Sequence, residues 1–176
     1  MLFPVQRTIL VFALLLMAAI AHADPENFIV DGFTFVRPPE WKWVANDKLA
    51  DKGLLLRIQG ASTNNTASVY FRTFNGDEGT AEKRIKGWRG YYKESPNSLK
   101  VRSATKTVGS FKVVYVEMEG KSDIVSGKEF SLIATIIQMK GGTFVARMSG
   151  RKKLVDDSKT TFTEMVEHAL KEKQPD

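Results

Sequence analysis

The sequence predicts an α+β fold in which an antiparallel β-sheet carries helices packed on its faces. Three observations support this prediction. Segments with the alternation typical of strands form two blocks, and each block is followed by one segment with helical periodicity. Short turns such as Asp31-Gly32 and Gly141-Gly142 separate neighbouring strand segments, which favours hairpins. Strands and helices do not alternate one by one as they do in parallel sheets, so hairpin-connected antiparallel strands are the economical arrangement.

The first strand block begins with two apolar runs, residues 28–30 and 33–36, on either side of the Asp31-Gly32 turn. Residues 40–44 then alternate between apolar and polar side chains. Two further runs carry the β-branched and aromatic content of strands, and these are residues 54–58 and 67–74.

Residues 80–92 are predicted to form a helix because their apolar side chains recur with helical spacing. The residues on this face are Ala81, Ile85, Trp88 and Tyr92. Thr80 is the expected N-cap. Gly87 and Gly90 are costly in a helix interior, so they predict close packing of this helix on the sheet.

The second strand block contains four segments and is followed by a final helix, residues 155–171. The four segments are residues 101–108, 111–118, 130–139 and 143–149. The third segment is apolar on both of its faces, which predicts a central strand covered above and below. The helix places an apolar stripe on one side, formed by Phe162, Met165, Val166, Ala169 and Leu170. Asp156 and Asp157 are interpreted as the N-cap and first-turn acids of this helix rather than as metal ligands.

The first 23 residues have the composition of an export signal. Arg7 is followed by an uncharged apolar core, residues 8–20, and then by the small-x-small motif Ala21-His22-Ala23. We expect residues 1–23 to be a signal peptide and residues 24–176 to be one exported domain, periplasmic or secreted. Retention of the leader as an anchor is the alternative, although a membrane span needs about 20 apolar residues and this core is shorter. Whether the leader is cleaved or kept stays open.

The composition excludes several kinds of chemistry. The chain has 176 residues, no cysteine and a net charge of +6. The absence of cysteine rules out thiol catalysis, disulfide exchange and thiolate metal sites. The mild basicity would suit an acidic partner, but export makes nucleic acid an unexpected one.

Several short motifs occur in an order and spacing that resemble one known family. They are Pro39-Glu40-Trp41, Gly79-Thr80-Ala81-Glu82 with Ile85 and Trp88, Leu132-Ile133-Ala134, Gly141-Gly142-Thr143-Phe144-Val145, Met148-Ser149-Gly150, and finally Phe162 and Met165. Over about residues 28–170 the chain resembles the PsbP-like α/β/α sandwich superfamily, and within it the exported bacterial branch of unknown function. The resemblance implies a binding scaffold without shared catalytic residues. A photosynthetic role is not expected, because the leader is not a Ser- and Arg-rich transit peptide.

Three functional hypotheses follow. The first is an exported, non-enzymatic binding or accessory protein of the cell envelope, with an envelope protein as partner. The second is a carrier that holds an apolar small molecule or peptide in a pocket between sheet and helix, which requires a cavity of about 300 Å³ or more. The third is a hydrolase that uses His168 as general base. We expect no enzyme activity, no catalytic residue, no cofactor and no metal site, and the oligomeric state stays open.

The candidate partner-binding residues are basic and aromatic. The first basic cluster is the outer face of the first helix, formed by Lys83, Arg84, Lys86 and Arg89. The second basic cluster precedes the last helix and consists of Arg151, Lys152 and Lys153. A solvated charged surface is the usual role of such clusters. Four aromatic side chains are candidates for a binding groove, with core packing as the commoner role, and these are Trp41, Trp43, Tyr91 and Tyr92.

Overall fold

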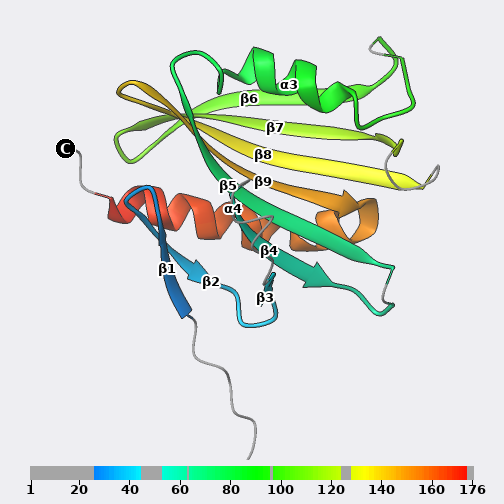
Figure 1. Cartoon of the computed structure of the whole chain (residues 1–176), viewed down its shortest axis with the longest axis horizontal. Coiled ribbons are helices and arrows are strands. Elements are labelled where there is room, and N and C mark those ends of the chain that lie inside the picture. Colours follow the sequence, from blue (N-terminus) through cyan, green and yellow to red (C-terminus); the bar gives the residue numbers. More distant parts are fainter. Residues whose placement is uncertain (1–25, 45–52, 63, 96, 124–127, 174–176) are drawn as a thin grey trace, which may run out of the picture.

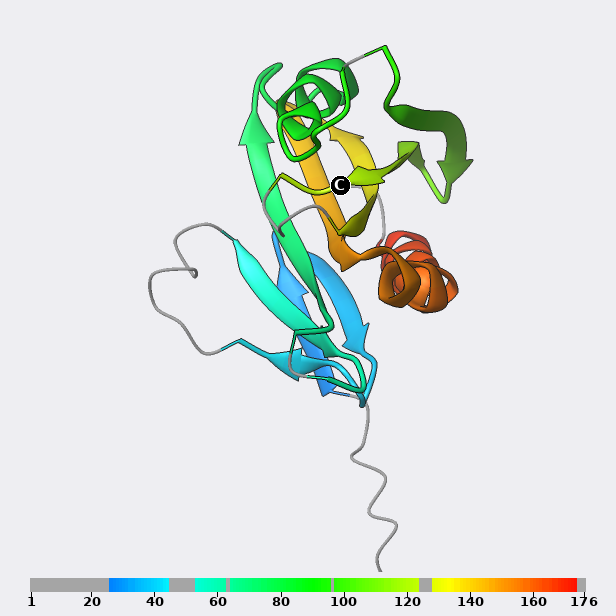
Figure 2. The ribbon, with the colours of Figure 1, turned by 90° about the vertical axis from the view of Figure 1, so that its right-hand side faces the viewer.

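A seven-stranded antiparallel sheet forms the centre of the molecule (Figure 1). The structure is a computed structural model that describes residues 26–44, 53–62, 64–95, 97–123 and 128–173. The strands are β1 (Glu26–Val30), β2 (Phe33–Arg37), β3 (Lys42–Trp43), β4 (Leu54–Gln59), β5 (Thr66–Asn75), β6 (Lys100–Val108), β7 (Phe111–Lys121), β8 (Glu129–Met139) and β9 (Gly142–Arg151). The sheet has the order β3-β4-β5-β9-β8-β7-β6, and β1 and β2 form a separate hairpin. The helices α3 (Ala81–Arg89) and α4 (Lys152–Glu172) lie on opposite faces of the sheet (Figure 2), so the predicted α+β class is confirmed.

The two hairpins expected from turn residues are present. Asp31 and Gly32 have φ angles of 49° and 77°, so both central residues of the β1–β2 turn adopt the left-handed conformation that this kind of turn requires. At the β8–β9 turn Gly141 has a φ of 87°, and Met139 pairs with Gly142. Each turn fixes the antiparallel register of the two strands that it joins.

Strand β8 is central and buried on both faces, as its composition predicts. Leu132, Ala134 and Ile136 point toward α3 and belong to one hydrophobic core. Ile133 and Ile137 point toward α4 and belong to the other. The sheet order places β8 between β7 and β9, so neither of its backbone edges is free.

Helix α4 buries the predicted apolar stripe but begins earlier than expected. Its buried residues include Phe162, Met165, Val166, Ala169 and Leu170. The N-cap is Arg151, so the interpretation of Asp156 and Asp157 as cap and first-turn acids is wrong. Lys152 Nζ lies 2.8 Å from Asp156, and Lys153 Nζ lies 2.7 Å from Asp157. Ion pairs between residues four apart stabilise a helical turn, and here they accompany an additional turn at the N-terminus. Among the described residues, neither helix combines the length and the apolar character needed to cross a membrane.

Helix α3 is shorter than predicted. Thr80 caps it as expected, because its Oγ1 accepts a hydrogen bond of 3.5 Å from the Lys83 N–H. The helix ends at Arg89, and Gly90 is its C-cap. Trp88 and Tyr92 anchor this segment, since both are buried in the core on the α3 side of the sheet.

The glycines of α3 do not mark close packing, which corrects the sequence interpretation. A Cβ atom added at Gly87 would meet nothing within 4 Å, and one added at Gly90 would be 3.5 Å from the nearest backbone oxygen. The close approach is at Gly79, one residue before the cap. A Cβ there would lie 2.5 Å from the Cβ of Thr143 and 2.9 Å from the Cβ of Phe74. Gly79, rather than the helix interior, is therefore the point where this segment packs tightly on the sheet.

The two helices cover very different lengths of the sheet. Helix α4 has 21 residues and spans about 31 Å, whereas α3 has 9 residues and spans about 13 Å. The core beneath α3 is built mainly on β7 and β8. On this face, part of β5 and β9 consequently lies beside the helix rather than beneath it.

Candidate functional site

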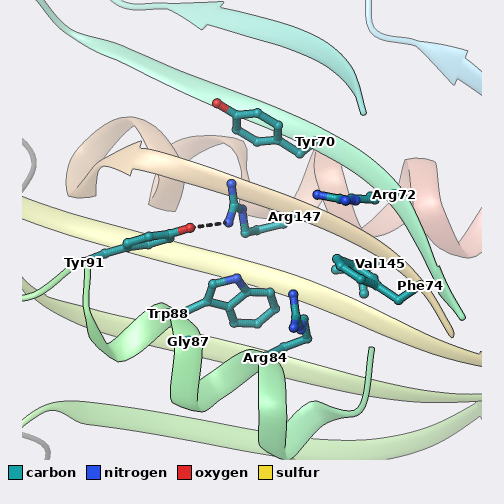
Figure 3. A pocket seen from close by; sticks show the side chains of 9 residues that line it. All are labelled: Tyr70, Arg72, Phe74, Arg84, Gly87, Trp88, Tyr91, Val145 and Arg147. Atoms are coloured by element: carbon teal, nitrogen blue, oxygen red, sulfur yellow. Dashed lines mark hydrogen bonds between the residues drawn. The ribbon is translucent and has the colours of Figure 1, made fainter. Parts of the chain in front are cut away.

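A groove of about 430 Å³ lies where α3 leaves β5 and β9 uncovered (Figure 3). Its lining residues are Tyr70, Arg72, Phe74, Arg84, Gly87, Trp88, Tyr91, Val145 and Arg147. The volume falls in the range of about 300–1,000 Å³ that is usual for sites of small molecules.

The two strands place five of these side chains on one face. Tyr70, Arg72 and Phe74 are alternate residues of β5, so they point to the same side of the sheet. Val145 and Arg147 do the same on β9. In the register of the two strands Tyr70 pairs with Arg147 and Arg72 pairs with Val145. The sheet therefore supplies a row of aromatic and cationic side chains opposite the helix.

The helix supplies the other wall. Arg84, Gly87 and Trp88 are three and four residues apart on α3 and face the groove together (Figure 3). Tyr91 follows just beyond the end of the helix. Because Gly87 has no side chain, the middle of this wall stays open.

Arg147 lies among three aromatic rings. Its guanidinium carbon is 4.6 Å from the centre of the Tyr70 ring, 5.5 Å from that of Tyr91 and 6.0 Å from that of Trp88. Its Nη1 donates a hydrogen bond of 3.1 Å to the Tyr91 hydroxyl oxygen. Stacking on ring faces stabilises the cation while leaving the donors at its rim available.

Arg72 and Arg84 both stack on one ring at the other end of the groove. Their guanidinium carbons are 5.0 Å and 4.3 Å from the centre of the Phe74 ring. Glu78 Oε2 lies 4.0 Å from Arg84 Nη2. No aspartate or glutamate is among the lining residues, so the groove carries an excess of positive charge.

Two donors in the groove lack a hydrogen-bond partner among the described residues. They are the buried Nε atoms of Arg84 and Arg147. Within the same part of the chain, Arg72 and Arg147 form no ion pair with a carboxylate. Both Nε atoms are enclosed by the protein, so an anion in the groove would pair with the terminal nitrogens of these guanidinium groups.

The first basic cluster is divided by the structure. Arg84 turns into the groove, whereas Lys86 and Arg89 lie outside its lining. Lys83 Nζ lies 2.9 Å from Asp77, and the hydrogen bond from Lys83 to this carboxylate raises the pKa of Lys83 above its usual value. Of this cluster, only Arg84 joins the groove.

The second basic cluster lies where β9 passes into α4. Lys152 Nζ is 3.1 Å from Glu119 and also pairs with Asp156, and Lys153 pairs with Asp157. Arg151 occupies the N-cap position of α4 without a capping hydrogen bond from its side chain, and it is half-buried. The first basic cluster is on α3 and the second at the start of α4, and these helices lie on opposite faces of the sheet (Figure 2).

The two tryptophans proposed for partner binding differ in exposure. Trp41 is 1% exposed and belongs to the core on the α4 side, so its assignment to a partner surface is wrong. Its carbonyl oxygen accepts a hydrogen bond from Arg37 Nη1. Trp43 is 37% exposed, and its Nε1 donates a hydrogen bond of 2.8 Å to Glu26.

The geometry needed for the hydrolase hypothesis is not found in the described part of the chain. His168 is exposed on α4. No serine or aspartate of the described residues is hydrogen-bonded to it. A search of the same residues finds no group of three or more histidines and carboxylates that could hold a metal ion.

Four groove residues escaped the sequence analysis, and these are Tyr70, Arg72, Phe74 and Arg147. The alternation of side chains along β5 and along β9 could have predicted these residues. On β5 the face opposite Ala67, Val69 and Phe71 carries Tyr70, Arg72 and Phe74. On β9 the face opposite Phe144, Ala146 and Met148 carries Val145 and Arg147. Such a mixed face indicates a surface that is partly covered and partly open.

Comparison with protein-family models and with curated proteins gives no match. Solved structures do match. The solution structure of cyanobacterial PsbP from Synechocystis sp. PCC 6803 is 13% identical, with a TM-score of 0.51, 84% of this chain covered and 92% of that chain. The protein of unknown function PA94 from Pseudomonas aeruginosa is 10% identical, with a TM-score of 0.48 and coverages of 87% and 98%. LpqN, involved in cell envelope biogenesis of Mycobacterium tuberculosis, is 15% identical, with a TM-score of 0.46 and coverages of 86% and 85%.

The antiparallel sheet with a helix on each face and the likeness to cyanobacterial PsbP together show that this chain has a PsbP-like fold.

Proposed function

We propose that the chain is an exported, non-enzymatic binding protein whose ligand is an organic anion held in the groove between α3 and strands β5 and β9. One observation carries the proposal. Three arginines and four aromatic side chains line a single groove that contains no acidic side chain. An organic anion matches this lining, because its charge can pair with the guanidinium groups and its apolar part can contact the rings.

The lining favours an anion over the two other candidates. A purely apolar ligand would cover Arg72 and Arg147 without supplying a counter-ion, and burying an unpaired cation is costly. An envelope protein docking on the basic clusters would compete with existing ion pairs, since Lys83, Lys152 and Lys153 already contact carboxylates. The groove therefore supports a carrier or sensor of small anions better than an accessory subunit.

Binding of the fluorescent organic anion 8-anilinonaphthalene-1-sulfonate tests the proposal. We expect one molecule bound per chain, measured by isothermal titration calorimetry. Arg147→Gln removes a cation and should weaken binding about tenfold or more, because a hydrogen bond to a charged group contributes about 1.5–3 kcal/mol. The matched control is Arg57→Gln, an equal change of charge at an exposed position of β4.

The control separates a local effect from an effect of net charge. Arg57→Gln should leave the dissociation constant unchanged within about twofold, since an exposed charge outside the groove lining is screened by salt. Equal affinities in the wild type, Arg147→Gln and Arg57→Gln would mean that the probe binds elsewhere, and the proposal would be wrong.

Export is supported by the leader rather than by the described residues. The apolar core of residues 8–20 and the Ala21-His22-Ala23 motif predict cleavage after Ala23. The N-terminal sequence of the protein recovered from expressing cells should therefore begin at Asp24, and the protein should be found outside the cytoplasm. Recovery of the intact leader from the cytoplasmic fraction would contradict this part of the proposal.

A further inference from the structure

The cations of the groove are gathered at two ends. The first end, here called the Arg147 end, consists of Arg147 with Tyr70 and Tyr91. The second, called the Phe74 end, consists of Arg72 and Arg84, whose guanidinium groups both contact the Phe74 ring. Figure 3 shows Arg147 near Tyr91 and Trp88, and Arg84 beside Phe74 and Val145.

The register of the sheet gives the separation of the two ends. Arg147 pairs with Tyr70, and Phe74 lies four residues further along β5. At about 3.3 Å per residue, Tyr70 and Phe74 are about 13 Å apart along the strand. The guanidinium carbon of Arg147 is 4.6 Å from the Tyr70 ring, and those of Arg72 and Arg84 are 5.0 Å and 4.3 Å from the Phe74 ring. The charges at the two ends are therefore separated on the order of 10 Å.

The middle of the groove is apolar. Val145 forms the floor and is 5% exposed. Trp88 is also 5% exposed and forms part of the helical wall. Opposite the floor, Gly87 leaves space where a side chain would otherwise project. A hydrocarbon or unsaturated segment can lie here without burying a polar group.

Each end contains a donor that lacks a partner among the described residues. Arg147 Nε is the donor at one end and Arg84 Nε at the other. Glu78 lies 4.0 Å from Arg84 Nη2. Arg72 and Arg147 form no ion pair with a carboxylate in the described part of the chain. A ligand with a single acidic group can satisfy one end only.

From this arrangement we infer that the groove selects elongated diacids, with one acidic group at the Arg147 end, the other at the Phe74 end and an apolar segment between them. This inference rests on the proposed function and makes it more specific. The spacing of the cations, rather than their number, sets the preferred length of the ligand. A compact dianion cannot reach both ends, because its charges lie much closer together than the arginines do.

A length series tests the inference. Straight-chain α,ω-dicarboxylates from about four to about twelve carbons, and monocarboxylates of the same lengths, are titrated into the protein in a calorimeter. An extended chain advances about 1.25 Å per C–C bond, so a span on the order of 10 Å corresponds to about nine carbons. We expect the dicarboxylate affinity to reach a maximum near that length, and to exceed that of the matched monocarboxylate about tenfold, because the second acid forms a charge-assisted bond.

Variants at the two ends identify the contacts. Arg147→Gln and Arg84→Gln should each remove the advantage of the diacid over the monoacid, whereas the exposed Arg57→Gln should preserve it. Circular dichroism and thermal unfolding verify that each variant is folded. Equal affinity for diacids and monoacids at every length, with both weakened by the groove variants, would overturn the two-ended inference and leave the proposed anion site standing. Affinities unaffected by either groove variant would overturn both.

Discussion

Gly79 is the most informative single position for the packing of α3, because the structure leaves no room for a side chain there. In Gly79→Ala the new Cβ would lie 2.5 Å from the Cβ of Thr143 and 2.9 Å from the Cβ of Phe74. Ordinary contacts between carbon atoms are about 3.5–4.0 Å, so the N-terminus of α3 must move away from the sheet by about 1 Å. Both neighbouring atoms are held by the paired strands β5 and β9, where Phe74 lies opposite Thr143.

The expected cost follows from this overlap. Overpacking of a tight site costs about 1–3 kcal/mol, and two clashes with atoms close to the backbone indicate about 2 kcal/mol. For a domain of this size the melting temperature should fall by about 4–8 °C. Because Phe74 lines the groove, the same displacement should also weaken binding of an organic anion.

Gly87→Ala is the matched control, since it is the same substitution in the same segment. Nothing lies within 4 Å of the added Cβ, and the position is inside α3. Alanine in place of a helical glycine should stabilise the protein by about 0.5–1 kcal/mol and raise the melting temperature by about 1–4 °C. Urea unfolding followed by circular dichroism measures both variants. Changes of the same sign in the free energy of unfolding would refute the assignment of Gly79 as the point of tight packing.

Two further predictions concern stability. The hydrogen bond from Trp43 to Glu26 lowers the pKa of this carboxyl group below its usual value of 4.5, so its contribution is present above that pH and is lost as the pH falls through the lowered pKa. Glu26→Gln should therefore reduce the free energy of unfolding at neutral pH but not in strong acid, and an equal reduction at both pH values would contradict this. Tyr115→Phe removes a hydroxyl that donates a hydrogen bond of 2.6 Å to Glu167, and should cost about 1–2 kcal/mol in urea unfolding. Tyr70→Phe is its control, because the Tyr70 hydroxyl forms no hydrogen bond to a described residue; equal losses in the two variants would refute the assignment.

Local patterns in the sequence are enough to predict most of the elements. The run of mostly apolar residues in 130–139 predicts burial on both faces of β8, because successive side chains of a strand point to opposite faces. The stripe that includes Phe162 and Met165 predicts the buried face of α4 for the same kind of reason. The start of α4 was missed because ion pairs from Lys152 and Lys153, rather than apolar side chains, extend it.

The groove is harder to predict because it depends on pairing between distant strands. Arg147 meets Tyr70 only because β5 pairs with β9, and these strands are more than 60 residues apart in sequence. Periodicity reports which face of each strand a residue occupies, but not which strand lies next to it. Arg84 was identified as basic, yet a charged helix face gives no indication of which member turns inward.

The groove also follows from the unequal lengths of the two helices. Helix α4 is long enough to cover one face of the sheet, whereas α3 covers only part of the other. A partly covered face would normally be solvated by small polar side chains, but here it carries aromatic rings with arginines stacked on them. Within the described residues only Arg84 of the three arginines has a carboxylate nearby, Glu78 at 4.0 Å. Holding the other two cations without a counter-ion opposes folding, since a partly buried cation loses hydration. Stacking on the rings offsets some of this loss and fixes the guanidinium groups in place before a ligand arrives. The arrangement is therefore costly for stability and favourable for binding an anion, which is the combination expected of a functional site rather than of a structural one.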